Sequence, residues 1–192
     1  MPRAGLTPER IVDVAAQIAD RAGLSAVTLA RVASKVGVRP PSLYAHVDGL
    51  DDLHARLATR GAHSLAAVLA PAAAGRARSD ALRSIAEAYR DWALAHPGLY
   101  AALQFRAAED DPATKAVVDL VISAIGGYGI AGDAAIHAAR TVRAALHGFI
   151  AIETEGGFRI PVDVDVSFTA LIATLDAGLG ARGAAAADST GG

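Results

Sequence analysis

Apolar residues recur at intervals of three and four along most of the chain, a spacing that predicts helices, and glycine or proline interrupts them. The first helix is expected over residues 8–22, after the cap Thr7 and before Gly23. Two shorter helices are expected over residues 29–36 and 41–47. No alternation of apolar and polar residues typical of a β-strand extends beyond a few positions. The pattern therefore indicates an all-α protein.

The remaining pattern predicts longer helices and one break in composition. The segment 71–78, "PAAAGRAR", has the character of a linker, and the tail 181–192 has so little to bury that it is expected to be disordered. With the three helices above, about nine are expected in all. The six longer ones cover residues 50–70, 79–95, 98–107, 112–125, 133–155 and 164–179.

This arrangement predicts two domains. Residues 1–49 would form a small N-terminal three-helix domain, and residues 50–180 a larger antiparallel helical bundle. The helix over 50–70 would link the two.

Charge and composition narrow the possible functions. The net charge is −2, yet no acid occurs between Asp20 and Asp48, and residues 1–60 carry eight Lys or Arg against six Asp or Glu. A basic N-terminal part in an otherwise acidic chain indicates a polyanionic partner. Because the chain has no cysteine, disulfides and thiolate metal sites are excluded. The N-terminus has no signal-peptide pattern and no apolar run approaches the length of a membrane span, so a soluble cytoplasmic protein without a membrane partner is expected.

Two short helices joined by a glycine turn, over residues 28–47, fit the helix-turn-helix pattern, in which the second helix enters the DNA major groove. If Leu43 and Val47 face the core, Ser42 and His46 lie together beside them and Tyr44 projects to the flank. Hydroxyl groups there can donate hydrogen bonds to phosphate, and no acid is present to repel it.

The stretch "VTLARVASKVGVRPPSLYAHV" resembles the TetR family of bacterial transcriptional regulators. The matching residues are T-L-x-x-V-A, then G-V, then L-Y-x-H, and the resemblance covers residues 7 to about 60. It departs from the family at Val47, where an aromatic is common, and at Leu50, where a phosphate-binding lysine is common. The resemblance implies DNA contacts by Thr28, Pro41, Ser42, Tyr44 and His46, with Arg39 and Pro40 at the helix entrance.

The C-terminal part is similar to a subgroup of that family with a Trp-His-Gly motif. In "LHGFIAIETEGGF", residues 146–158, His147 and Gly148 are kept and Leu146 replaces the tryptophan. This resemblance implies a ligand-binding bundle that forms a homodimer through its last two helices. The ligand would be an unidentified small molecule, and its candidate contacts are Tyr89, Trp92, Tyr100, Phe105, Arg143 and His147.

The sequence therefore predicts a homodimeric, ligand-responsive regulator, a repressor rather than an activator, that binds a pseudo-palindromic operator in double-stranded DNA. The alternative is a helical small-molecule-binding protein that no longer reads DNA. No nucleophile–base pair and no metal-ligand spacing occur, so no enzyme activity, metal or cofactor is expected.

Overall fold

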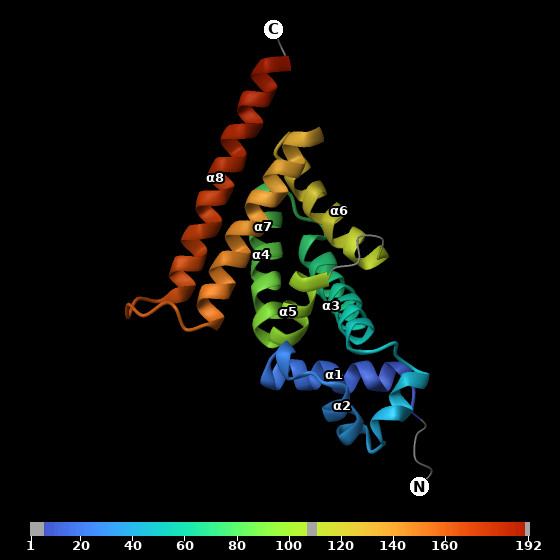
Figure 1. The fold of residues 1–192 in the computed structure, drawn as a ribbon. Helices are drawn as coiled ribbons and strands as arrows, with labels where there is room; N and C mark the ends of the chain where they lie inside the picture. The colour runs from blue at the N-terminus through green and yellow to red at the C-terminus, as the bar shows by residue number, and fades with distance from the viewer. Residues whose placement is uncertain (1–5, 107–110, 191–192) are drawn as a thin grey trace. The chain divides into compact units, whose positions relative to one another are not determined.

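The chain is helical throughout the residues that the computed structural model describes, which are 6–106 and 111–190. Within these ranges no strand is present, and the eight α-helices together with the 3-10 helix η2 correspond to the nine helices predicted (Figure 1). The all-α fold class is thus confirmed. The elements are α1 (Pro8–Ala22), η1 (Leu24–Ala26), α2 (Leu29–Val36), η2 (Pro40–Ala45), α3 (Leu50–Ala73), α4 (Arg78–Ala95), α5 (Pro97–Arg106), α6 (Pro112–Gly126), α7 (Gly132–Thr154) and α8 (Val164–Thr190).

These helices form two compact units. Unit 1 comprises Met1–Ala66 and Ala95–Lys115, and unit 2 comprises Ala67–Leu94 and Ala116–Gly192. The division differs from the boundary expected after residue 49, because the first part of α3 and all of α5 belong to unit 1. The assignment of residues 1–49 to DNA binding and 50–180 to ligand binding and dimerisation is functional, and it stays a prediction.

Unit 1 is built on an apolar core shared by its first helices. α1 has one buried face, and buried side chains from α2, from η2 and from the first part of α3 complete the core. Leu43 and Val47 are both buried, as their spacing predicts. This core holds α2 and η2 in one arrangement. Its main side chains are Ile11, Ala15, Ile18, Val32, Leu43, Val47, Leu53 and Leu57.

The turn between α2 and η2 depends on Gly37. Its φ of 81° and ψ of 32° lie in the left-handed region, where a side chain would be strained. The Gly37 N–H donates to the carbonyls of Ala33 and Ser34 and thereby closes α2. The sequence prediction of a stop at this glycine is confirmed.

The segment after this turn is wound more tightly than expected. It forms the 3-10 helix η2 from Pro40, where an α-helix beginning at Pro41 was predicted. The Ser42 N–H donates to the Arg39 carbonyl at 2.9 Å and the His46 N–H to the Leu43 carbonyl at 2.8 Å, both i to i+3 bonds. Because the two prolines supply no N–H, they cannot donate intrahelical bonds in the first turn. Arg39, the residue before the first proline, has an extended backbone.

Unit 2 has its own core, formed by α4, α6, α7 and α8. One buried apolar face from each helix meets the others, and half-buried side chains such as Tyr89 and Phe149 pack at its margin. The core therefore brings α8, the last helix in sequence, against α4, which begins at Arg78, far earlier in the chain. Its buried members are Leu82, Ala86, Ile125, Tyr128, Ile130, Ala135, Ala138, Val142, Leu146, Phe168, Ile172 and Leu179.

Two helices extend further than the sequence predicts. α3 continues past Pro71 to Ala73, and its last carbonyls accept hydrogen bonds from the Arg76 guanidinium, including one of 3.1 Å at Ala72. α8 continues to Thr190, so the tail expected to be disordered from residue 181 is helical over the described residues. Two features explain why α8 extends this far. Alanines at 184–187 favour helix, and a Cβ on Gly183 would lie 1.9 Å from the Tyr128 carbonyl oxygen, so the backbone of α8 packs directly there.

Asp176 on α8 connects three parts of unit 2. Its carboxylate accepts hydrogen bonds from the Tyr128 hydroxyl and, at 3.0 Å, from the Ser79 hydroxyl of α4. Burial of the ring raises the pKa of Tyr128 well above its ordinary value, and the hydrogen bond to Asp176 adds to this rise. The folded chain therefore holds the Tyr128 proton more tightly than the unfolded chain does.

We expect this difference to appear as lost stability at alkaline pH. In the unfolded chain Tyr128 ionises near its ordinary pKa of about 10, so above that pH unfolding releases a proton. The free energy of unfolding should then fall by up to about 1.4 kcal/mol per pH unit from this residue. Urea denaturation of wild type and Tyr128→Phe across this range measures the effect as a difference between the two proteins. Equal pH slopes would contradict it.

Candidate nucleic-acid interface

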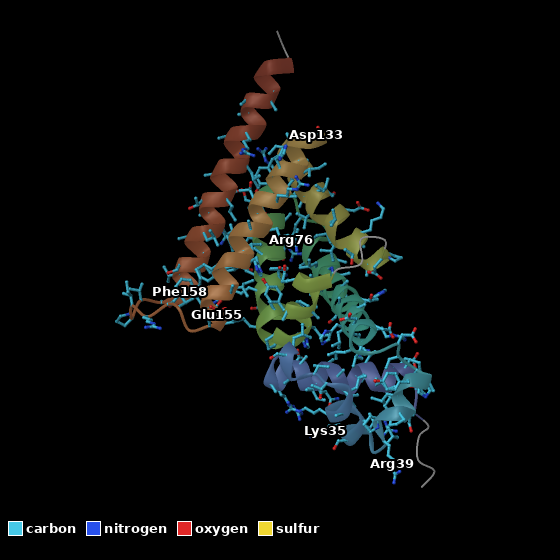
Figure 2. All side chains as sticks on the ribbon, in the orientation of Figure 1. Lys35, Arg39, Arg76, Asp133, Glu155 and Phe158 are labelled. Carbon is cyan, nitrogen blue, oxygen red and sulfur yellow. The ribbon has the colours of Figure 1, made fainter. Side chains whose placement is uncertain are left out.

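The residues predicted to contact DNA lie at one surface of unit 1. Of the seven predicted residues, six are exposed and the seventh, His46, is half-buried. Tyr44 is 59% exposed although the neighbouring Leu43 is fully buried. Figure 2 shows Lys35 and Arg39 at the outer surface of the same helix pair. The structure thus brings together the whole predicted set, namely Thr28, Arg39, Pro40, Pro41, Ser42, Tyr44 and His46.

This surface offers neutral hydrogen-bond donors together with positive charge. The Thr28 hydroxyl oxygen accepts the Arg31 N–H at 3.2 Å and so caps α2. Its hydroxyl proton can still donate to an anion, as can those of Ser42 and Tyr44. Arg39 adds a guanidinium at the entrance of η2. Such groups suit the phosphate backbone of a nucleic acid.

Among the acids that follow this surface in sequence, Asp52 is engaged within the protein. The Asp52 carboxylate accepts two hydrogen bonds from Arg56 Nε, at 2.9 and 3.0 Å, and one from the Asp48 N–H at 2.9 Å. The Arg56 hydrogen bond holds the pKa of Asp52 below its ordinary value. The negative charge beside the predicted DNA surface is therefore partly neutralised by Arg56.

The candidate ligand contacts are divided between the two units. Tyr100 is buried in unit 1, whereas Tyr89, Trp92, Arg143 and His147 belong to unit 2. Within unit 2, Trp92 is buried, Tyr89 packs at the core margin, His147 is half-buried and Arg143 is exposed. The side chain of Phe105 lies outside the described residues.

Two of the surface hollows among the described residues lie in unit 2. One, of about 280 Å³, lies along the loop between α7 and α8 and is lined by Phe158, Ile160 and Val162 among others. The other, of about 590 Å³, lies between Tyr128 and the C-terminal half of α8. Neither includes any of the residues predicted to contact a ligand.

A partly buried ion cluster in unit 2 was missed by sequence reasoning. Arg90 of α4 donates to the Glu153 carboxylate of α7 with two nitrogens and to Asp165 of α8 at 2.8 Å. Its guanidinium also lies 4.7 Å from the centre of the Phe168 ring. Since the partners lie 63 and 75 residues from Arg90, no local spacing could have predicted the contact.

A second long-range contact was also missed, this time in unit 1. The Asp20 carboxylate of α1 accepts the N–H groups of Gly98 and Leu99, at 2.9 and 3.2 Å, and so caps α5. The sequence contains only a weak signal for this contact. Asp20 is the last acid before the acid-free window, and the sequence only predicts a break between the helices over 79–95 and 98–107.

An exposed helix-turn-helix surface on an all-α chain defines a DNA-binding regulator as its class, and the comparisons with known proteins agree. Residues 82–175 match the tetracyclin repressor-like C-terminal domain. The chain is 38% identical over 184 residues to the HTH-type transcriptional regulator YobS of Bacillus subtilis, covering 93% of this chain and 95% of YobS. It is also 38% identical over 184 residues to the HTH-type regulator Rv0681 of Mycobacterium tuberculosis, covering 93% and 84%.

A solved structure shows the same fold at lower identity. The Streptomyces coelicolor TetR family protein ActR, in complex with (S)-DNPA, superposes with a TM-score of 0.69 at 20% identity, covering 94% of this chain and all of that one. The chain belongs to the TetR family of helix-turn-helix transcriptional regulators, a family of regulators and not of enzymes. The family predicted from residues 28–47 is confirmed.

Proposed function

We propose that this protein is a cytoplasmic, homodimeric repressor that binds a pseudo-palindromic operator and is released from it by a small molecule. The observation that carries the proposal is the exposed, acid-free surface formed by α2 and η2 on a buried core. The match to the tetracyclin repressor-like domain favours repression over activation. Two copies of this surface would enter major grooves about one helical turn, roughly 34 Å, or a multiple apart.

In this proposal the residues divide by role. Tyr44, Thr28 and Arg39 contact phosphates, which hold the protein in register on the duplex. Pro41 and Ser42, at the start of η2, face base edges and contribute sequence preference, and His46 supports the exit of η2. Pro40 positions the entrance of the same helix.

The proposed dimer forms through α7 and α8, because one face of α8 has nothing to cover it within the described chain. Over Val164–Ala187, α8 is long and apolar enough to cross a membrane by length and composition, yet only 17% of that window is buried. The exposed face carries no charge, and the hydroxyls of Thr169 and Thr174 donate to carbonyls of their own helix. A second copy of α8 covers such a face well. The residues of this exposed face are Val166, Thr169, Ala170, Ala173, Thr174, Ala177 and Ala181.

We assign the effector site to unit 2, between α4, α6 and α7. Tyr89 and half-buried Val121 and Ile122 lie at the margin of the core there and suit an apolar molecule. His147 and Arg143 would supply polar contacts, and Trp92 would support α4. Tyr100 and Phe105 belong to unit 1 and are not part of this assignment. The complex of ActR with (S)-DNPA supports a small-molecule ligand.

The DNA-binding role is tested by fluorescence anisotropy on DNA flanking the protein's own gene, at two salt concentrations. Tyr44→Ala should weaken binding about tenfold or more on every sequence, because it removes a hydrogen bond to a charged phosphate. The salt slope should be unchanged, because tyrosine is neutral. Arg39→Ala should instead reduce the slope by about 0.9, since one fewer phosphate is neutralised.

Two further variants separate loss of the Tyr44 hydroxyl from loss of the whole side chain and from a substitution away from the DNA surface. Tyr44→Phe removes only the hydroxyl, and Val118→Ala removes an exposed apolar side chain of α6, 53% exposed, that the proposal leaves off the DNA. Val118→Ala should bind like wild type. Weak, salt-insensitive binding that Tyr44→Ala leaves untouched, on flanking DNA and on DNA selected from random sequence, would instead favour a helical small-molecule-binding protein that no longer reads DNA.

A further inference from the structure

The α7–α8 loop, residues 155–163, presents two large apolar side chains to solvent. Ile160 is 77% exposed and Val162 is 63% exposed, the highest values among the large hydrophobic residues of the described chain. The hollow of about 280 Å³ lies beside them and is also lined by Phe158 and Val164. The loop projects outward from the ends of α7 and α8 (Figure 1). Apolar side chains gathered beside a hollow are typical of a surface that another molecule covers.

The loop is held by contacts within unit 2, although its apolar tip is exposed. The Gly157 N–H donates to the Ile152 carbonyl at 2.7 Å, and a Cβ on Gly157 would lie 2.7 Å from a side-chain carbon of Ile152. The centre of the Phe158 ring lies 4.8 Å from that of Phe149, which in turn lies 5.1 Å from that of Phe168. The tip is therefore presented in one arrangement, so little conformational entropy is lost when another molecule covers it.

The face of α8 proposed for the dimer is too small to form a stable interface alone. It comprises seven residues, namely one valine, two threonines and four alanines. A specific interface buries about 800 Å² on each partner, through roughly 20 to 30 residues a side. Besides the contribution of α7, further surface must therefore be covered in a stable dimer. The α7–α8 loop is continuous with this face, which begins at Val166, only four residues after Val162.

We propose that the α7–α8 loop is a second docking surface for the partner copy, on which Ile160 and Val162 pack against the other subunit and its apolar side chains fill the hollow. This inference rests on the proposed homodimer and deepens it. A second copy suits the loop because a subunit seated on the α8 face lies within its reach. The exposed charges of Glu155, Arg159 and Asp163 flank the apolar pair, as a polar rim does. Two-fold symmetry gives each dimer two such contacts.

The first test compares dimer dissociation constants by sedimentation equilibrium. Ile160→Ser should weaken the dimer about tenfold or more, because two buried isoleucine side chains are lost per dimer. Val162→Ser, the second variant, should act in the same direction. Both side chains are largely exposed in a single subunit, so the folded monomer should be kept, as far-UV circular dichroism checks. Val118→Ser, at a 53% exposed valine of α6, is the matched control and should dimerise like wild type.

The second test identifies what the loop contacts. The photoreactive residue p-benzoylphenylalanine is placed at position 160 of the full chain, and isotope-labelled and unlabelled copies are mixed before illumination. We expect crosslinked peptides that combine the two isotopes, which prove contact between subunits. The same photoreactive residue at position 118 should give no such peptides.

The outcomes separate this inference from the proposed dimer. A wild-type dimer, equally tight dimers of Ile160→Ser and Val118→Ser, and no intersubunit crosslink from position 160 would overturn the inference alone. Weaker dimerisation of Ile160→Ser without that crosslink would also overturn it, because the effect would then act through α8. A crosslink to phosphatidylglycerol vesicles, and none to the partner, would assign the surface to a membrane instead. Wild-type protein that stays monomeric at every concentration would overturn the proposed dimer itself.

Discussion

Gly98→Ala is expected to destabilise the protein by about 3 kcal/mol or more, although alanine is the better helix former by about 1 kcal/mol. The substitution destabilises the protein because of the atoms that the new methyl group meets. It would lie 2.2 to 2.4 Å from Ala19 and Asp20 atoms, two of which are backbone atoms of α1. A flexible side chain could move aside, whereas the backbone of α1 is fixed by Ile11, Ala15 and Ile18 in the core. α5 would have to shift, which breaks the two hydrogen bonds to Asp20.

Urea denaturation measures this loss, at one fixed protein concentration because the stability of the proposed dimer would depend on concentration. The control is Gly126→Ala, at the end of α6, where an added Cβ meets nothing within 4 Å and φ is not positive. It should change the free energy of unfolding by less than about 1 kcal/mol. A Gly98→Ala protein as stable as the control would show that α1 and α5 can separate at little cost, which contradicts the close contact.

The sequence predicts those features of this fold that depend on neighbours in the chain. α1 and α2 have the predicted bounds, and Thr7 and Thr28 cap them through hydrogen bonds from the Arg10 and Arg31 N–H groups, each 3.2 Å. Caps and a 3.6-residue apolar period act over a few residues, so they can be read from one segment alone. The buried Leu43 and Val47, and through them the exposed Tyr44, follow from the same period.

Features that depend on distant residues were not predicted. The Asp20 cap joins residues 78 positions apart, and the Arg90 contacts span 63 and 75. The extent of α8 was underestimated for a related reason, because its last turns are held by contact of Gly183 with Tyr128 as well as by alanine. The candidate ligand residues were grouped by helical spacing and aromatic type, which does not indicate that Tyr100 belongs to unit 1, where α5 packs with α1.

Ala173→Glu should abolish the proposed dimer while leaving the monomer folded. Ala173 is exposed at the middle of the uncharged face of α8, whereas the opposite face carries Phe168 and Ile172 into the core of unit 2. In a dimer formed by this face, each Glu would be buried without a partner and would face its copy across the two-fold axis. Burying an unpaired charge costs about 3 kcal/mol or more, which is about a hundredfold in the dimer dissociation constant.

Sedimentation equilibrium across a range of concentrations gives the dissociation constant, and far-UV circular dichroism checks the helices. Ala67→Glu, at an exposed alanine of α3, is the matched control and should remain dimeric. Because the helix-turn-helix is untouched, Ala173→Glu should still bind an isolated half-site but lose the added affinity that wild type gains from two. Unchanged dimerisation of Ala173→Glu would exclude this face as the interface. The exposed apolar surface of α8 over Val164–Ala187 would then need another partner, and its length and hydropathy make a membrane surface the next to test.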